Sequence, residues 1–145
     1  MRKLIITPFV VAMLYGCAGV ANNQAELSLI DKKQLVIGVW AMMPLRNGIA
    51  NVVEYTADGK SKLHSFNCTK PGETAVEESA YSISEDGKVI SISSPYQNFD
   101  LRVLSFKRNA MKLGMTIEGM ELQFSYLKTS KVAPLCALYE KAIEQ

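Results

Sequence analysis

The feature that most constrains the fold of this chain is a strict alternation of apolar and polar side chains near its C-terminus. Every second residue of one run is apolar and those between are polar, with Met120, Leu122, Phe124 and Tyr126 set against Glu121, Gln123 and Ser125. The preceding run repeats the order with Met111, Leu113, Met115 and Ile117. Because successive side chains of a strand point to opposite faces, the alternation predicts an antiparallel pair with one apolar face.

Short runs rich in Val, Ile, Tyr and Phe recur along the chain between turn signals such as Asp58-Gly59 and Asp86-Gly87, which are strong hairpin cues. We predict eight strands, at residues 35 to 43, 49 to 57, 61 to 68, 76 to 84, 88 to 93, 100 to 107, 110 to 117 and 120 to 128. In an open sheet two edge strands would stay unpaired, and closure removes both edges. We therefore expect a mainly β fold, an eight-stranded antiparallel up-and-down β-barrel.

The last segment has a different period. After Pro134, apolar residues recur at helical spacing, at Leu135, Leu138, Tyr139 and Ile143, which predicts a C-terminal α-helix with one apolar face. We expect this helix to pack on the outer wall of the barrel. A length of 145 residues with 48% hydrophobic and 21% charged residues suits a single folded domain.

The N-terminus has the parts of a secretory signal peptide. Arg2 and Lys3 precede an apolar run from Leu4 to Leu14, which is too short for the roughly 20 residues of a membrane-spanning helix. A buried strand or helix is the alternative, and the two basic residues at the start disfavour it. We expect residues 1–16 to be the signal peptide, 17–33 a lipidated cysteine and tether, and 34–145 the barrel with its C-terminal helix.

The residues Leu14-Tyr15-Gly16-Cys17 resemble the lipobox of bacterial lipoproteins. The resemblance implies that signal peptidase recognises Leu14 and Gly16 and that Cys17 becomes the first mature residue, carrying palmitate-type acyl chains. Several acyl chains together hold a protein stably on a membrane. Ala18, where an Asp would favour the inner membrane, implies a periplasm-facing location on the outer membrane. The alternative is an ordinary thiol at Cys17 in a soluble secreted protein.

Lipidation of Cys17 would leave Cys68 and Cys136 as the remaining thiols. In an oxidising periplasm an even remainder is interpreted as a disulfide pair, which would tie the C-terminal helix to the body of the domain. The alternative is a redox or metal-binding pair, but the two residues lack Cys-x-x-Cys spacing and a nearby His. We therefore expect a structural disulfide.

Gly38-Val39-Trp40 stands in the first predicted strand. Together with eight meandering strands, a C-terminal helix and a disulfide to that tail, it resembles the lipocalins and the broader calycin group. The resemblance implies that Gly38 lets the strand bend at the closed end and that Trp40 packs across the barrel floor. The family usually covers this Trp with an Arg from the last strand, and here Lys128 is the nearest cation.

The inward positions of the last two strands are candidates for lining an apolar cavity: Met111, Leu113, Met115, Leu122, Phe124 and Tyr126. Flexible thioethers suit a permissive pocket, although the same side chains can simply fill an eight-stranded barrel. Four aromatic residues are candidates for the barrel mouth, and ordinary strand packing is the alternative for each: Tyr55, Tyr81, Tyr96 and Phe99.

The remaining composition argues against several function classes. A net charge of +2 gives no basic surface for nucleic acid, and no metal-ligand cluster or cofactor motif appears. His64 is the single His, on a predicted strand, where a hydrogen-bonded structural role is favoured over a catalytic one. We expect a non-catalytic barrel that binds a small apolar ligand or an envelope component; the alternative is an interaction protein, such as an immunity factor or an inhibitor of a cell-wall hydrolase.

Overall fold

The structure is a computed structural model that describes residues 29–143. Its elements in chain order are helix α1 (Leu29–Val36), strands β1 (Gly38–Met42), β2 (Val52–Tyr55), β3 (Lys60–Ser65), β4 (Ala75–Ile83), β5 (Val89–Ser93), β6 (Asn98–Phe106), β7 (Ala110–Ile117) and β8 (Met120–Thr129), and helix α2 (Cys136–Ile143). The signal peptide, Cys17 and most of the expected tether lie outside the described residues. No described helix is long and apolar enough to cross a membrane.

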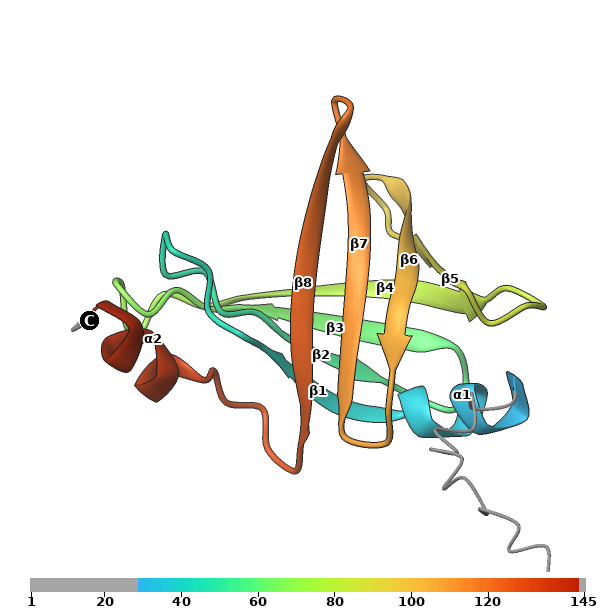
Figure 1. The fold of residues 1–145 in the computed structure, drawn as a ribbon, viewed down its shortest axis with the longest axis horizontal. Coiled ribbons are helices and arrows are strands. Elements are labelled where there is room, and N and C mark those ends of the chain that lie inside the picture. The colour runs from blue at the N-terminus through green and yellow to red at the C-terminus, as the bar shows by residue number, and fades with distance from the viewer. Residues whose placement is uncertain (1–28, 144–145) are drawn as a thin grey trace, which may run out of the picture.

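The eight strands close into an antiparallel barrel. Each strand pairs with the next, and β1 returns to pair with β8, with Trp40 opposite Lys128. In Figure 1, β1 to β4 run across the direction of β6, β7 and β8, so the barrel resembles two crossed sheets. The predicted fold class, an eight-stranded up-and-down barrel with a C-terminal helix, is confirmed.

The predicted strand positions agree with the structure best where the alternation is strictest. The strand expected at residues 110 to 117 is β7, and the pairing of Ile117 with Met120 places a tight turn at Glu118-Gly119. The first strand differs, because it begins at Gly38 and the preceding residues form α1. Residues 29 to 33, expected in the tether, belong to that helix.

The two ends of the barrel are built differently. At what we call the closed end lie α1, the start of β1 and three short turns, those between β2 and β3, β4 and β5, and β6 and β7 (Figure 1). At the open end lie the other connections, including the β7–β8 hairpin, which rises above its neighbours in Figure 1. The packed core contains Trp40, Tyr55, Ile90, Met111 and Leu113, all buried.

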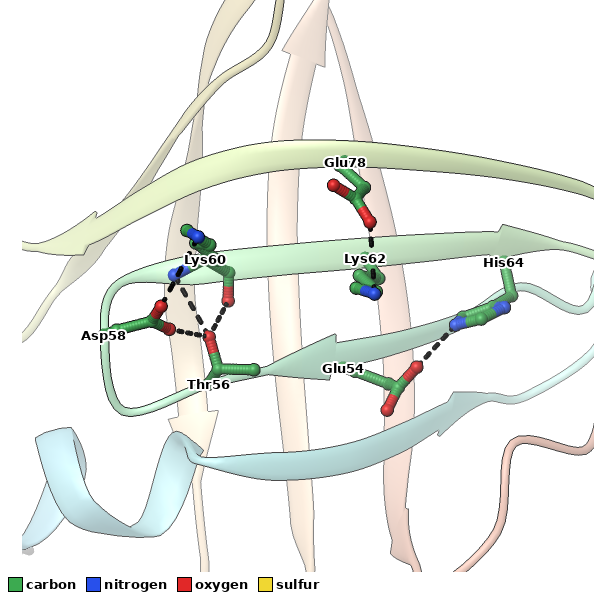
Figure 2. Close-up of polar contacts among 7 residues, drawn as sticks. All are labelled: Glu54, Thr56, Asp58, Lys60, Lys62, His64 and Glu78. Carbon is green, nitrogen blue, oxygen red and sulfur yellow. Dashed lines mark hydrogen bonds and ion pairs between the residues drawn. The ribbon is translucent and has the colours of Figure 1, made fainter.

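Two of the closed-end turns use the same chemistry, and Figure 2 shows one of them. Thr56 Oγ1 donates to Asp58, and the Lys60 N–H donates to Thr56 Oγ1. In the second turn Ser84 and Asp86 take the same places. Each turn then has a glycine at positive φ, Gly59 or Gly87, where residues with a Cβ are disfavoured. The Asp-Gly turns predicted from the sequence are therefore present.

Cys68 and Cys136 form a disulfide with a Cα–Cα distance of 5.3 Å, as predicted. It ties the start of α2 to the β3–β4 connection at the open end. β8 finishes at the closed end, so the segment from Thr129 to Cys136 runs back along the outside of the barrel (Figure 1). Ala41 and Val52, whose side chains point outward from β1 and β2, are fully buried. Figure 1 shows α2 beside the β3–β4 connection at the open end, and not along the outer wall where it was expected.

Candidate functional site

The register of β7 and β8 brings the predicted cavity residues together. Three pairs face each other across the two strands: Met111 with Tyr126, Leu113 with Phe124, and Met115 with Leu122. All six side chains therefore share the inner face of the barrel. They do not share one environment, however. Met111–Tyr126 and Leu113–Phe124 lie in the closed half of the barrel, and Met115–Leu122 lies near the mouth.

In the closed half the interior is filled. Met111 and Leu113 belong to the same packed cluster as Trp40, and Tyr126 packs against that cluster. Burial raises the pKa of Tyr126 to about 12, which fits a phenol that is far from water. All three lie in or against the packed core, which is the filled-barrel alternative that the sequence left open.

In the open half the inward side chains are partly exposed. Ile117 and Leu122 are 42% and 40% exposed, and Met120, next to the hairpin turn, is 62% exposed. Met115 is half-buried against the edge of the core. An apolar inner surface that the described residues leave partly exposed is a feature of ligand-binding or interaction sites.

A groove of about 710 Å³ opens in this half, between β6 and the upper part of β7. It is lined by residues of β5, β6, β7 and the β5–β6 loop, namely Val89, Gln97, Phe99, Asp100, Arg102, Gly114, Met115, Thr116 and Ile117. Its volume is within the roughly 300 to 1,000 Å³ of small-molecule sites. Phe99, a predicted mouth residue, and Met115, a predicted cavity residue, both contribute to it.

The groove lies where the barrel wall is not sealed. The β6–β7 ladder ends at the pair Arg102 and Gly114, although β6 begins at Asn98 and β7 continues to Ile117. Beyond that pair, β6 bonds only to β5, and β7 bonds only to β8, within the described residues. We call this opening the β6–β7 seam.

An ion pair crosses β7 at the lower end of the seam. Arg102 Nη2 of β6 lies 2.6 Å from Glu121 Oε2 of β8, and the hydrogen bond from Arg102 is the main cause that lowers the pKa of Glu121. Gly114 lies between them on β7, and a Cβ there would come within 3.2 Å of Leu104 and 3.4 Å of Glu121. Glycine at position 114 therefore leaves room beside β7 for the Leu104 and Glu121 side chains.

The closed end shows how the Gly38, Trp40 and Lys128 positions work. Trp40 Nε1 donates to the Val36 carbonyl at 2.7 Å, and Lys128 Nζ donates to the Leu35 carbonyl at 2.6 Å. Lys128 Nζ also lies 5.2 Å from the centroid of the Trp40 ring, within the range of a cation–π contact. These contacts secure the C-terminal end of α1 over the barrel floor.

Gly38 makes this arrangement possible. Its φ of +124° is disfavoured for residues with a Cβ, and a Cβ there would lie 3.1 Å from Lys128 Cε. Desolvation is the main cause, ahead of the charge of Arg108, that lowers the pKa of Lys128. Lys128 thus covers Trp40 in the place where the resemblance leads one to expect an Arg.

Two of the four predicted mouth residues lie elsewhere. Tyr55 is buried in the core, and its ring packs edge-on against Tyr81 with 4.8 Å between centroids. The Tyr81 hydroxyl donates to the Thr56 carbonyl in the closed-end turn. Both are therefore closed-end packing residues, the alternative that the sequence left open. Tyr96, in the β5–β6 loop at the open end, is 86% exposed.

His64 points outward from β3 and lies 2.6 Å from Glu54 of β2, as Figure 2 shows. On the same outer face Lys62 pairs with Glu78 of β4 at 3.1 Å. These are cross-strand contacts that stabilise a sheet surface, and none of these residues lines the groove. Within the described residues no group of three or more His, Cys, Asp or Glu side chains is placed to hold a metal.

The sequence did not predict the polar residues of the groove. Asp100, Arg102, Gly114 and Thr116 lie on the wet face of their strands and have the composition of an ordinary barrel exterior. The one signal was Gly114, a glycine inside a strand, which often marks a close approach of neighbouring groups.

No protein-family model matches the sequence, and no curated protein matches it. Similar solved structures include a protein from Bacteroides uniformis, with a TM-score of 0.56 and 14% identity over 68% of this chain and 93% of that chain. Lobster apocrustacyanin A1 has a TM-score of 0.42 and 16% identity, over 77% of this chain and 68% of that one. The bovine lipocalin allergen Bos d 2 has a TM-score of 0.43 and 12% identity, over 77% of this chain and 83% of that chain. The first similarity shows a shared fold.

Proposed function

We propose that this protein is a non-catalytic binding protein that holds a small apolar ligand in the open half of its barrel. The observation that carries the proposal is the groove of about 710 Å³ with Phe99, Met115 and Ile117 on its inner side. Eight-stranded up-and-down barrels, lipocalins among them, are known for holding a small ligand. Because the described side chains of the closed half form a packed core, the open end is the favoured place for a ligand.

The chemistry of the described residues supports binding over catalysis. Within that part of the chain the single His pairs with Glu54 on the outer wall and does not line the groove. The groove contributes one carboxylate, Asp100, and one guanidinium, Arg102, which pairs with Glu121 outside the groove lining. This set holds and orients a ligand without an evident nucleophile or proton-transfer pair.

Native mass spectrometry of the purified protein, combined with solvent extraction of bound lipids, tests the binding proposal. We expect an apolar molecule to accompany the wild type and to be lost from Met115→Trp, whose larger side chain would fill the groove. Leu127→Trp is the matched control, because Leu127 is exposed on the outer wall and does not line the groove. An empty wild type that also binds no added hydrophobic probe would overturn the proposal.

The proposed location is the periplasmic side of the outer membrane, with Cys17 as the lipid attachment site. The support is the sequence Leu14-Tyr15-Gly16-Cys17 after a charged start and a short apolar run. Because α1 lies at the closed end, a lipid on Cys17 would tether the barrel by that end. The open end would then be free to face the periplasm.

Metabolic labelling with a clickable fatty acid tests the anchor. The wild type should carry the label and fractionate with outer membranes, whereas Cys17→Ser should carry none. Cys68→Ser in the same strain controls for labelling of other thiols, and should keep the lipid. A wild type without label would contradict the anchor while leaving the ligand-binding proposal intact.

The second candidate is an interaction protein, such as an immunity factor or an inhibitor of a cell-wall hydrolase. The exposed Met120 and Tyr96 at the open end favour it, because large exposed apolar side chains are common at protein interfaces. Tyr96→Ser, which removes an exposed aromatic ring outside the groove lining, separates the two functions. Loss of protection against a periplasmic hydrolase with unchanged ligand binding would support this candidate, and unchanged protection would count against it.

A further inference from the structure

The β6–β7 seam leaves main-chain groups without partners. In an antiparallel ladder, residues that exchange hydrogen bonds across two strands alternate with residues that do not. Val103 donates its N–H to Lys88, on the β5 side, so Arg102 and, two residues before it, Asp100 direct theirs toward β7. Asp100 and Thr116 would thus form the next bonded pair after Arg102 and Gly114, and no ladder pair joins them in the described chain.

The groove lies at this seam, beside the unbonded stretch of β6 and β7, and we call that stretch the passage. Its lining includes consecutive residues of both strands, Phe99 and Asp100 on β6 and Met115 to Ile117 on β7. Consecutive side chains in a strand point to opposite faces, so the lining residues include both inward-pointing and outward-pointing ones. Phe99, Met115 and Ile117 form the inner side of the passage, while Asp100, Arg102 and Thr116 form the outer side.

The two sides of the passage differ in chemistry. The inner side is apolar and continues into the partly exposed interior of the open half. On the outer side Glu121 neutralises Arg102, whereas Asp100 has neither an ion pair nor a side-chain hydrogen bond among the described residues. The uncompensated charge at the outer edge is therefore negative, and the free side-chain groups there are mainly acceptors.

From this arrangement we infer that the ligand is a single-chain amphiphile that lies through the seam, with its apolar chain on Phe99, Met115 and Ile117 and a hydrogen-bond-donating, non-anionic head group at Asp100 and Thr116. This inference rests on the proposed function and deepens it, because it names the ligand class and the route of entry. The head group supplies a donor to the Asp100 carboxylate, and the main-chain N–H and C=O groups of the seam outside the ladder offer further polar contacts. An anionic head group would meet repulsion from Asp100.

Calorimetric titration with three dodecyl probes, each below its critical micelle concentration or its solubility limit, tests the ligand class. The probes are dodecylamine, dodecanoate and dodecanol, which share one chain and differ in head group. We expect dodecylamine to bind about tenfold or more tightly than dodecanoate, the size of effect that one charge-assisted hydrogen bond gives. Dodecanol should lie between them. Equal or tighter binding of dodecanoate overturns the inference about the head group.

Substitution of Asp100 tests whether this carboxylate binds the head group. Asp100→Asn should lower the affinity for dodecylamine about tenfold and leave the affinity for dodecanol unchanged. Glu85→Gln is the matched control for loss of one negative charge, because Glu85 is exposed in a closed-end turn. If both variants lower the amine affinity equally, the effect is one of overall charge, and Asp100 has no specific role.

Blocking the seam from outside tests the route. Thr116→Trp places a large side chain on the outer side of the passage and leaves the interior residues unchanged. We expect it to weaken dodecylamine binding at least about tenfold, the loss typical for one obstructed ligand contact. Lys112→Trp is the control, since Lys112 is an exposed outward residue of the same strand where β6 and β7 are paired.

The outcomes separate this inference from the proposed function. If all three probes bind the wild type and Thr116→Trp equally well, the ligand enters by the barrel mouth; the seam route is then wrong and the binding function stands. If no probe binds the wild type, both are wrong. Thermal unfolding of each variant confirms that a loss of binding does not come from a loss of folded protein.

Discussion

The two halves of the barrel are made by the same strands and yet differ in how their interiors are filled. On β7, Met111 and Leu113 are buried in a packed core, whereas Met115 and Ile117, two and four residues farther on, line a groove. The side chains are of the same kind in both halves. What differs is the pairing of the strands, because β6 and β7 are bonded below Gly114 and separate above it. Local sequence pattern thus sets which face is apolar, and strand pairing sets whether that face is filled or open.

The largest expected difference between the halves is in stability. Trp40→Ala removes the largest side chain of the closed half and should lower the free energy of unfolding by about 3–5 kcal/mol. Ile117→Ala in the open half should change it by no more than about 0.5 kcal/mol, as is usual for exposed positions. Urea denaturation of both variants measures this. Similar losses for the two would contradict the division into a filled and an open half.

The disulfide should come next in size. The double variant Cys68→Ser with Cys136→Ser frees α2 from the β3–β4 connection, and removal of a native disulfide typically costs about 2–5 kcal/mol. Urea denaturation should show this loss in the free energy of unfolding. The NMR signals of the backbone amides in the closed-half strands should stay unchanged. A variant with full stability would mean that the C-terminal segment is held by packing alone.

Lys128 should matter less than Trp40 but more than other surface lysines. Lys128→Met keeps the length of the side chain and loses the contact with the Trp40 ring, worth about 1 kcal/mol, together with the hydrogen bond to Leu35. Lys112→Met, on the outer wall, should be close to neutral. Equal effects of the two substitutions in thermal unfolding would show that the cation over Trp40 does not hold α1.

The buried phenol of Tyr126 predicts a loss of stability in alkali. Its pKa is raised from the ordinary 10.0 to about 12 in the folded protein. The neutral phenol therefore contributes fully to the free energy of unfolding below pH 10, and this contribution is lost as the pH rises through about 12. Tyr126→Phe should show a smaller fall in unfolding free energy over this range than the wild type. Tyr96→Phe, at an exposed position, should follow the wild type.

The smallest effect should come from the ion pair beside the seam. The pKa of Glu121 is lowered, chiefly by the hydrogen bond from Arg102. Its stabilising contribution is therefore present above the ordinary value of 4.5 and is lost as the pH falls through the lower value of the folded state. The free energy of unfolding of Glu121→Gln, measured as the pH is lowered, should lack the fall caused by protonation of Glu121. Glu85→Gln should keep that fall. Because both partners are exposed, the difference should be slight.

The sequence predicted the barrel because strand alternation is a local property. The runs at Met111 to Ile117 and Met120 to Tyr126 specify the inner face of β7 and β8, and the Asp-Gly turns specify two hairpins. The first strand was placed too early, because Leu35 and Val36 suit a strand but end α1, and β1 begins only after the chain turns at Gly38, whose φ is positive.

The groove could be predicted only in part. Phe99 and Met115 were recognisable as inward apolar residues near the mouth, but the sequence does not say how far β6 stays bonded to β7. That depends on a bulge near Leu104 and on the crossing of Arg102 to Glu121 over Gly114, which are contacts between distant parts of the chain. Asp100 and Thr116 became candidate site residues only once that register was known.

Amide hydrogen exchange measured by NMR on the ligand-free protein tests the open seam most directly. The Lys112 N–H lies in the paired part of the β6–β7 ladder, and the Thr116 N–H points toward β6 where that ladder has ended. The account predicts strong protection at Lys112 and fast exchange at Thr116. Equal, strong protection at both residues would show that β6 and β7 are joined along their whole length, and would contradict the seam and the ligand site built on it.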